Sequence, residues 1–457
     1  MKFMLKLDNE ILRSALLEIS AIAERAGGSA LVVGGSVRDS LLGIPVKDLD
    51  IEVYGIDPEH LAKALAGSFS IDLVGQSFGV IKLQGIPIDV SIPRRESKAG
   101  SGHRGFNVCS DPGMSVEEAC LRRDFTINAM AFDPRSERLY DYHNGVKDLN
   151  NRRLRHVSEK FSEDPLRVLR GMQFAARFNL TAASDTLRLC AGLETEDLPK
   201  ERIFEEWRKM LLKGSLISRG LDFLRKSGWV RYYPELEALI GCRQDPVWHP
   251  EGDVWTHTLL CLDAFAAERI GDEFEDLVVG LAVLCHDFGK PLTTFKDGER
   301  IRSPGHSEAG VESAANFVRR ISDQKDLLEA VPPLVLDHMR PVELHKSKAS
   351  AAAIRRLSAR VGRIDRLVRV ARADRPGSGQ DLSEEDAAGD WLLAKAEELA
   401  VRDSAPVPLV MGRHLIQLGR RPGPAFKPIL DKCYDAQLDG EIATLEEGLA
   451  LVREMLK

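Results

Sequence analysis

A glycine turn and two closely spaced carboxylates stand together near the beginning of the chain. Residues 30–33 are apolar and predict a buried strand, residues 34–36 (Gly-Gly-Ser) predict a tight turn, and residues 37–42 begin a helix. A glycine turn that leads into a helix presents free backbone N–H groups and favours a phosphate. Asp48 and Asp50 follow in the next predicted strand, and alternate residues of a strand share a face. Both carboxylates are therefore expected to point the same way.

These carboxylates predict a metal site for phosphoryl chemistry. Two carboxylates that point together repel each other unless a cation lies between them, and Mg²⁺ is the expected cation beside a phosphate. Asp89, in the apolar segment 86–92, supplies a third carboxylate on a predicted neighbouring strand. The expected chemistry is in-line attack of a hydroxyl on a nucleotide phosphate with two metal ions. Each feature alone is commonly structural, but their order and closeness favour catalysis.

Two further polar strings could bind a nucleotide. Arg122 and Arg123 stand just before an apolar strand, and their guanidinium forks suit triphosphate oxygens. Without a function they would be a basic pair at the C-terminus of a helix. Asp164 precedes Pro165 and predicts the N-cap of a helix, and Arg167 follows on that helix. Taken alone, this second string would be a capped amphipathic helix with solvated arginines.

The strings resemble the class II tRNA nucleotidyltransferases and bacterial poly(A) polymerases of the polymerase-beta-like nucleotidyltransferase superfamily. The resemblance implies that Asp48 and Asp50 hold Mg²⁺ and that Asp89 assists in deprotonating the attacking hydroxyl. It also implies that Asp164 and Arg167 recognise the Watson–Crick edge of CTP or ATP. A carboxylate can accept from the exocyclic amine that cytosine and adenine carry and uracil lacks. The residues expected to bind the nucleotide are Gly35, Ser36, Arg38, Arg122, Arg123, Asp124, Asn128, Asp164, Arg167 and Arg170.

Histidines and aspartates recur in helical settings in the second half of the chain. A lone histidine would be a core residue by default, but the joint set resembles the HD superfamily of metal-dependent phosphohydrolases. The resemblance implies a first divalent metal on His257, His286, Asp287 and Asp374, and a second completed by His306 and His338. Imidazole and carboxylate ligands suit Mn, Ni, Fe or Zn, and Lys290 could steady a phosphate. The alternative is a domain that keeps these ligands but serves as a scaffold.

The surrounding pattern predicts an α+β protein in four parts. Residues 1–157 are expected to form a polymerase-beta-like nucleotidyltransferase head with a mixed sheet. Helices alone are expected afterwards: a neck for base recognition and RNA binding at 158–246, an HD phosphohydrolase-like domain at 247–380, and a tail at 381–457. Strands are expected over 73–74, 80–83 and 86–92 of the head. The polar segment between residues 93 and 120 predicts a mobile loop, with disorder as the alternative.

Six arginines recur at every third position of one predicted helix. They are Arg360, Arg363, Arg366, Arg369, Arg372 and Arg375. Such a row could contact RNA phosphates near the metal site. Equally, it could be a solvated face on which Asp365 and neighbouring acids pair with some of the arginines.

Composition limits the class of protein. The 457 residues carry a formal net charge of -7, which argues against indiscriminate nucleic-acid binding and requires any RNA site to be local. The seven cysteines are scattered without a Cys-x-x-Cys pair, which predicts reduced thiols in the cytoplasm. The chain shows no apolar run long enough for a signal peptide or a membrane span.

Together the patterns predict template-independent addition of CCA to the 3′ end of tRNA from CTP and ATP, with release of pyrophosphate. The HD domain is expected to add hydrolysis of phosphates such as 2′,3′-cyclic phosphodiesters. A poly(A) polymerase or an enzyme that adds only adenosine would carry the same motifs and stays open. Less favoured are an HD phosphohydrolase with a vestigial head and an RNA-binding module without catalysis. Oligomeric state is left open.

Overall fold

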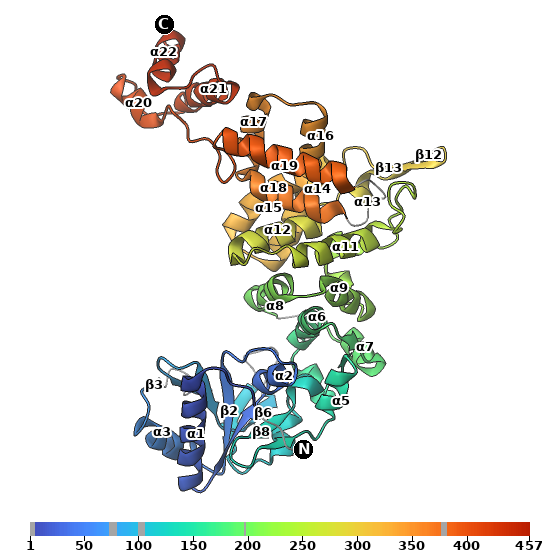
Figure 1. Ribbon diagram of the computed structural model, residues 1–457, viewed down its shortest axis with the longest axis vertical. Coiled ribbons are helices and arrows are strands. Elements are labelled where there is room, and N and C mark those ends of the chain that lie inside the picture. Colours follow the sequence, from blue (N-terminus) through green and yellow to red (C-terminus); the bar gives the residue numbers. More distant parts are fainter. Residues whose placement is uncertain (1–4, 73–79, 99–105, 196–197, 376–381) are drawn as a thin grey trace. The chain divides into compact units, whose positions relative to one another are not determined.

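The computed structural model describes residues 5–72, 80–98, 106–195, 198–375 and 382–457 (Figure 1). The chain divides into two compact units. The first contains the residues up to Met210 together with Arg219–Tyr232, and the second contains Leu211–Ser218 together with Tyr233–Lys457. The expected α+β class is confirmed, because a mixed sheet occupies the first unit and helices dominate the second. The finer division at residues 157, 246 and 380 stays a prediction.

A mixed sheet forms the centre of the first unit. Among the described residues its strands run in the order β3-β4-β5-β2-β1-β8-β9. Their bounds are β1 Ser29–Val33, β2 Leu49–Tyr54, β3 Ile71–Asp72, β4 Val80–Leu83, β5 Ile88–Ser91, β8 Ala131–Asp133 and β9 Arg138–Tyr140. β2 and β5 are parallel, whereas β1 pairs antiparallel with both β2 and β8. The expected strands at 80–83 and 86–92 are confirmed with small shifts, and the one at 73–74 lies outside the described residues.

Helices α1 (Glu10–Arg25) and α3 (Pro58–Ala66) bury apolar faces in the sheet's core. The side chain of Asn9 caps α1 by accepting hydrogen bonds from the N–H groups of Ile11 and Leu12. Helix α2 (Gly35–Leu41) follows β1 through Gly34, whose φ of 71° is a conformation that glycine adopts without strain. The turn between strand and helix is therefore present as the sequence predicted.

The expectation of a mobile loop between residues 93 and 120 is wrong for the part that is described. β6 (Arg94–Lys98) and β7 (Phe106–Ser110) pair antiparallel, and α4 (Val116–Cys120) follows. Residues 99–105 lie outside the described residues. The pairing satisfies backbone groups that a polar composition does not reveal, and Arg95 Nε lies 2.6 Å from Asp111 Oδ2 at the base of the pair.

The rest of the first unit is mostly helical. It contains η2 (Thr126–Asn128), α5 (Gly145–Asn150), η3 (Glu159–Glu163), α6 (Leu166–Phe178), α7 (Ser184–Ala191), α9 (Ile217–Lys226) and η4 (Trp229–Tyr232), and α8 spans Lys200–Lys213. Strands do not end at residue 158 as expected, because β10 (Arg153–Leu154) pairs with β11 (Thr181–Ala182). Likewise β12 (Phe295–Asp297) pairs with β13 (Arg300–Arg302) in the second unit. Two or three residues are too few to give a sequence period.

Helices pack on one another in the second unit. They are α10 Pro234–Glu237, α11 Val254–Ala267, α12 Glu273–Cys285, α13 Lys290–Thr293, α14 His306–Ile321, α15 Lys325–Asp337, α16 Arg340–Lys346, α17 Ala351–Val361, α18 Ile364–Asp374, α19 Leu382–Glu398, α20 Gly412–Gln417, α21 Phe426–Asp439 and α22 Leu445–Met455. α12 is buried from Asp276 to Cys285. It contacts α11, α15 and α18 (Figure 1). No helix among the described residues is long and apolar enough to cross a membrane. All seven cysteines, each within the described part, have free thiols as expected.

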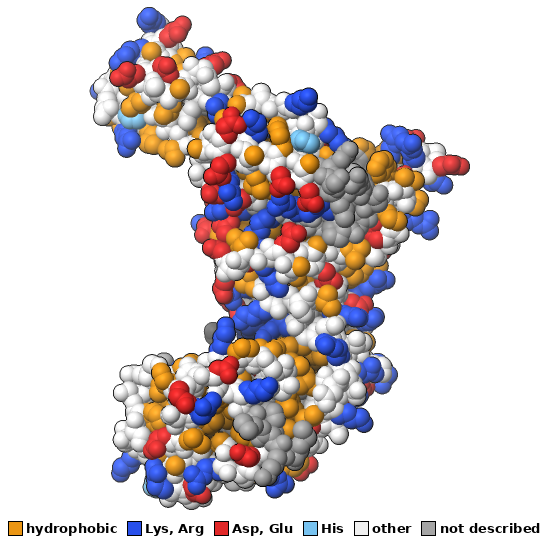
Figure 2. All heavy atoms as spheres, viewed as in Figure 1, with side chains coloured by type: hydrophobic (Ala, Val, Ile, Leu, Met, Phe, Trp, Pro, Cys, Tyr) orange, Lys and Arg blue, Asp and Glu red, His pale blue; other side chains and the backbone are white. Residues whose placement is uncertain are grey.

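The six regularly spaced arginines do not share one helix. The chain breaks at Gly362 (φ 75°), between α17 and α18. Every one of them forms an ion pair: Arg360 with Asp337, Arg363 with Asp365, Arg366 with Glu275, Arg369 with Asp276, Arg372 with Asp390, and Arg375 with Asp386. Figure 2 accordingly shows acidic and basic side chains interspersed over the visible face of the second unit. The structure favours the paired alternative over a row of RNA contacts.

Candidate functional site

Three carboxylates meet where β2 and β5 begin. Asp48 immediately precedes β2, and Asp50 is its second residue. In the parallel register of the two strands, Asp50 stands opposite Asp89. Asp48 and Asp50 are exposed to solvent and Asp89 is half-buried. The structure thus brings together the three acids that the sequence predicted to act together.

The neighbouring acids affect the ionisation of Asp50. The surrounding protein raises the pKa of Asp50, and the charges of Asp48, Asp89 and Glu52 raise it further, whereas Arg123 lowers it. A carboxylate held in this way against like charges is stabilised by a nearby cation. The donor set consists of carboxylate oxygens with solvent access, which suits Mg²⁺.

The turn before α2 brings a cation and a phosphate-binding backbone to these acids. A Cβ on Gly34 would lie 3.2 Å from Arg123 Nη1 and 3.9 Å from Asp50 Oδ2, so the glycine lets both groups approach the turn. Arg123 Nη2 lies 2.8 Å from Glu52 Oε1. The Ser36 hydroxyl donates to the backbone oxygen of Asp48 at 3.0 Å and fixes the turn against the start of β2.

Four of the residues expected to bind the nucleotide form a chain of contacts within the protein. Arg38 is 4% exposed and donates to Asn128 Oδ1, with its guanidinium 4.4 Å from the ring centre of Phe178. Asn128 Nδ2 donates to Asp124 Oδ1 at 2.9 Å, and Arg170 Nε donates to Asp124 Oδ2 at 2.7 Å. These contacts join α2 to α6, and it was not predicted from the sequence that the four side chains would contact one another.

The contacts of Asp124 with Asn128 and Arg170 determine its ionisation. Burial alone would raise the pKa of Asp124, but the charge of Arg170 and hydrogen bonds from Asn128 and Arg170 lower it. Asp124 is therefore held as a carboxylate, and it fixes Arg170 on α6 beside the string that contains Arg122 and Arg123.

The two residues expected to read the base lie at the start of α6. Asp164 Oδ1 accepts from the Leu166 N–H at 3.1 Å, and its Oδ2 lies 3.0 Å from Arg202 Nη2. Asp164 thus makes the expected capping bond, although the helix begins one residue later than predicted. Arg167 donates to the backbone oxygens of Lys160 at 2.7 Å and Arg122 at 2.9 Å. Arg202, from α8, was not among the predicted site residues; the string of residues 198–206 resembles a further element of the family, for which only a stabilising helix around Glu201 and Arg202 was expected.

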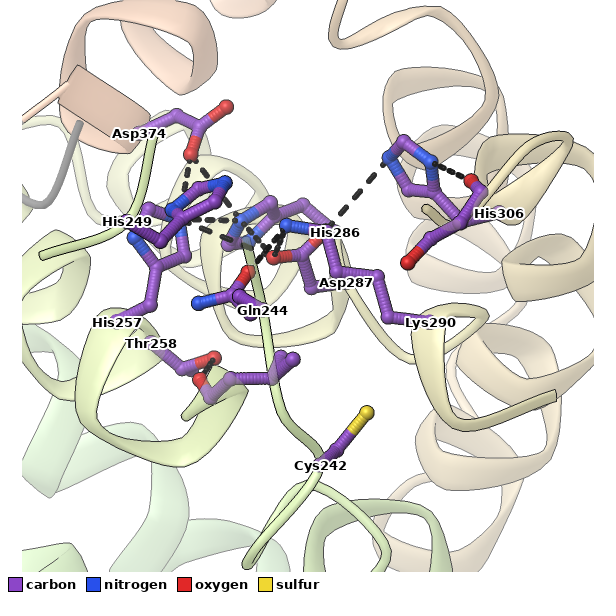
Figure 3. A network of polar contacts seen from close by, with 12 residues as sticks. Cys242, Gln244, His249, His257, Thr258, His286, Asp287, Lys290, His306 and Asp374 are labelled. Carbon is purple, nitrogen blue, oxygen red and sulfur yellow. Dashed lines mark hydrogen bonds and ion pairs between the residues drawn. The ribbon is translucent and has the colours of Figure 1, made fainter. Parts of the chain in front are cut away.

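In the second unit, a group of four possible metal ligands lies where three helices meet (Figure 3). The group contains His257 and Cys261 from α11, His286 from the end of α12, and Asp374 from the end of α18. His257 Nε2 lies 2.7 Å from Asp374 Oδ1 and 3.4 Å from His286 Nε2. His286 Nε2 lies 3.3 Å from Asp374 Oδ1. The sequence predicted three of these residues and missed Cys261.

A second group adjoins the first. Among the described residues, Asp287, His306 and His338 also hold donor atoms close to one another. His306 Nε2 lies 3.3 Å from His338 Nε2 and 3.7 Å from Asp287 Oδ1. The other oxygen of Asp287 lies 3.2 Å from His286 Nε2, so this carboxylate stands between the groups. The expected assignment of Asp287 to the first metal stays a prediction.

Each histidine ring is held in place through its Nδ1 atom, on the side of the ring away from the other ligands. The Nδ1 atoms of His286 and His338 lie 2.7 Å from the backbone oxygens of Val283 and Val335, and His306 Nδ1 lies 3.0 Å from that of Ser303. A carbonyl oxygen only accepts, so each Nδ1 carries a proton and each Nε2 is the ring atom that faces the site. The Nδ1 of His257 faces Glu251 Oε1 at 2.9 Å. This is the outer support usual for histidine ligands of metals.

The charge balance of the two groups fits a bound cation. Burial and the neighbouring His286 lower the pKa of His338 to about 4, so its ring is a neutral ligand at pH 7. Burial opposes the charge on Asp287, yet His286 and Lys290 keep its pKa low. Both oxygens of Asp287 are buried and accept no well-directed hydrogen bond within the described chain. The residues therefore fit a transition metal with imidazole and carboxylate ligands.

A cavity of about 420 Å³ opens beside these ligands. Lys290 lines it, with Nζ 2.8 Å from Asp287 Oδ2 and 2.7 Å from Gln244 Oε1. Trp248, 53% exposed, and His249 also line it. The sequence predicted Lys290 but not Gln244, His249 or Glu251, which precede α11 in a stretch without helical period.

Known proteins resemble this chain in sequence. The family model of the poly(A) polymerase head domain matches residues 30–155. A multifunctional CCA protein of Halorhodospira halophila is 37% identical over 377 residues, which is 80% of this chain and 88% of the relative. One from Acinetobacter baumannii is 38% identical over 298 residues, 64% of this chain and 69% of the relative.

Solved structures share the fold. The Bacillus stearothermophilus CCA-adding enzyme in complex with CTP has a TM-score of 0.65 at 22% identity, covering 98% of each chain. The Thermotoga maritima CCA-adding enzyme complexed with tRNA has a TM-score of 0.57 at 19% identity, covering 98% of this chain and 96% of the other. With the close sequence relatives spanning most of both chains, this chain belongs to the multifunctional CCA protein family.

Proposed function

We propose that the chain adds CCA to the 3′ end of tRNA from CTP and ATP and releases pyrophosphate. The observation that carries the proposal is the placement of Asp50 opposite Asp89 and beside Asp48, next to a glycine turn. Membership of the multifunctional CCA protein family supports the same reaction. The substrates, tRNA and nucleotides, are consistent with work in the cytoplasm.

The residues of the first unit have distinct parts in this reaction. Asp48 and Asp50 would hold Mg²⁺, which supplies charge stabilisation for the attacking and leaving oxygens of an in-line displacement. Asp89 stands opposite Asp50, and its Oδ2 lies 3.2 Å from Lys82 Nζ. In this proposal Asp89 accepts the proton of the RNA 3′-hydroxyl. Arg123 and the N–H groups at the start of α2 bind the triphosphate.

In this proposal, Asp164 and Arg167 at the start of α6 select the base. Asp164 accepts from the exocyclic amine of cytosine or adenine, and Arg167 donates to the ring acceptors. Arg202 and the backbone oxygens of Lys160 and Arg122 hold the two side chains in place before the nucleotide arrives. The chain of contacts from Arg38 to Arg170 fixes α6 relative to α2, and so acts by positioning.

We also propose that the second unit hydrolyses phosphoesters, with 2′,3′-cyclic phosphates at RNA ends as the substrate class. The specific support is that two groups of metal ligands adjoin a cavity containing Lys290. His257, His286, Asp374 and the second group would hold divalent transition metal, which supplies a hydroxide nucleophile when bound. Lys290 binds the phosphate oxygens, and Trp248 offers a surface on which a base can stack.

One experiment separates these activities. A tRNA ending before its CCA is incubated with CTP, ATP or both, and the products are resolved on a sequencing gel. We expect two cytidines and then one adenosine from the wild type and from His338→Ala, and no extension from Asp50→Asn. Adenosine tails on unrelated RNA from ATP alone would make the enzyme a poly(A) polymerase.

The same proteins are then given a 2′,3′-cyclic phosphate. We expect hydrolysis by the wild type and by Asp50→Asn, and none by His338→Ala. No hydrolysis by the wild type with Mn²⁺, Ni²⁺, Fe²⁺ or Zn²⁺ would contradict the second proposal and favour the scaffold alternative.

A further inference from the structure

Cys261 lies inside the first ligand group of the second unit, although the HD resemblance assigns no role to it. Its side chain is 0% exposed, and its Sγ lies 3.4 Å from His257 Nε2 and 4.0 Å from Asp374 Oδ1. It follows His257 by one turn of α11, and residues four apart on a helix share a face. The thiol therefore points to the same place as the imidazole.

Three of the distances among the four donors match those of a metal coordination shell, one is shorter and one is longer. Bond lengths of about 2.0–2.2 Å to nitrogen and oxygen and about 2.3 Å to sulfur place tetrahedral ligands about 3.3–3.6 Å apart. His257 lies 3.4 Å from both Cys261 Sγ and His286 Nε2, and His286 Nε2 lies 3.3 Å from Asp374 Oδ1. His257 Nε2 and Asp374 Oδ1 stand closer, at 2.7 Å, as a hydrogen-bonded pair does, and Cys261 Sγ stands farther from Asp374 Oδ1, at 4.0 Å.

The geometry points to Cys261 as an additional protein ligand of the metal in this group, bound through its thiolate. This inference rests on the proposed metal-dependent function of the second unit. On binding, the thiol gives its proton to solvent and the sulfur donates a lone pair to the metal, with no change of oxidation state. His306 and His338 remain for a second ion or for water and phosphate, and Asp287 lies between the two groups.

A sulfur ligand changes which metal the group prefers. Thiolate and imidazole together favour Zn²⁺, Co²⁺ or Ni²⁺ over Mg²⁺ and Mn²⁺, which prefer oxygen. An all-imidazole and carboxylate set would discriminate less between them. The inference thus names a metal class that the remaining ligands leave open.

Cobalt substitution tests the inference directly. The full-length chain is stripped of metal by chelation and titrated with Co²⁺, and its absorption spectrum is recorded. Tetrahedral Co²⁺ absorbs in the visible range, and a Co²⁺–thiolate bond adds an intense charge-transfer band in the near ultraviolet. We expect both in the wild type and only the visible absorption in Cys261→Ser and Cys261→Ala, with Zn²⁺ affinity at least about tenfold lower.

Cys242→Ser is the matched control. Cys242 lies in the same unit, half-buried and 3.8 Å from Thr294 Oγ1, and it belongs to neither ligand group (Figure 3). This variant should keep the charge-transfer band. Nucleotide addition by the head should be unchanged in all three variants, which checks that the chain is folded.

The outcomes separate the inference from the proposal beneath it. Visible absorption without a charge-transfer band in the wild type, or a band that survives in Cys261→Ala, would overturn the thiolate ligand and leave the metal site standing. A wild-type chain that binds neither Co²⁺ nor Zn²⁺ would overturn both.

Discussion

The ion pair between Arg366 and Glu275 decides between two roles for the arginine row. Arg366 Nε and Nη2 lie 2.6 and 2.7 Å from the two oxygens of Glu275, and each side chain is 12% exposed. The pair joins α18 to α12, whose far ends carry Asp374 and His286. If the row is structural, Arg366→Gln should destabilise the second unit and leave RNA binding unchanged.

The expected magnitude follows from this geometry. Removing one partner of a fully buried pair costs about 3–5 kcal/mol, and an exposed pair contributes at most about 1 kcal/mol. Because Arg366 and Glu275 are mostly but not wholly buried, we expect a loss of about 2–3 kcal/mol in the free energy of unfolding. For a unit of this size that is a fall of roughly 5–10 °C in Tm.

Arg372→Gln supplies the control. Its partner Asp390 is 71% exposed, so we expect a loss below about 1 kcal/mol. Calorimetry of the full chain gives the Tm of each transition, and amide hydrogen exchange shows whether peptides of α12 and α18 lose protection. Equilibrium binding of tRNA is measured in parallel at several salt concentrations.

The refuting result is specific. An Arg366→Gln protein with unchanged Tm, but with weaker tRNA binding and a salt dependence reduced by about one charge, would show that Arg366 contacts a phosphate. The paired interpretation of the row would then fail.

Three further predictions concern the first unit. Asp50→Asn should lower nucleotide addition at least about 10³-fold. The same variant should have a higher Tm than the wild type in Mg²⁺-free buffer at pH 7, because a carboxyl with a raised pKa destabilises the fold when it is charged. A lower Tm would contradict this. Asp164→Ala should lower kcat/KM for CTP and ATP and leave tRNA affinity unchanged, as measured by single-nucleotide extension; unaltered preference over UTP would exclude base reading. The lowered pKa of Asp124 contributes stability that is present above its ordinary pKa and is lost as pH falls through the folded value. Asp124→Asn should therefore flatten the acid side of the head's Tm-against-pH curve.

Most of the fold and the acidic site of the head could be predicted from local sequence patterns. The Asp-x-Asp pair with apolar neighbours set the face of β2, and Asp89 between apolar residues set that of β5, so their meeting needed only the pairing of the two strands. The helical spacing of His257 and the apolar helix before His286 likewise indicated ligands at helix ends. These features depend on residues within one element or its immediate neighbour.

The features that could not be predicted depend on contacts between residues that are far apart in the sequence. The arginines of α18 looked like a basic row because Glu275 and Asp276 stand some 90 positions earlier, on α12. Arg38 was expected at a phosphate, but its burial depends on Asn128 and on the ring of Phe178. Cys261 drew no attention because a single cysteine on an apolar helix is ordinarily core.

The two histidines that end α12 and α15 occur in the same tetrapeptide pattern, Val283-Leu-Cys-His286 and Val335-Leu-Asp-His338. In each, the ring is fastened to the carbonyl three residues earlier, so its direction is settled before any other helix docks. The orientation of each ring therefore depends on its own helix alone, and a change in the length of the neighbouring loops should not turn it. Asp374 has no such anchor of its own in this pattern, so drift in helix packing should alter its position before that of the histidines.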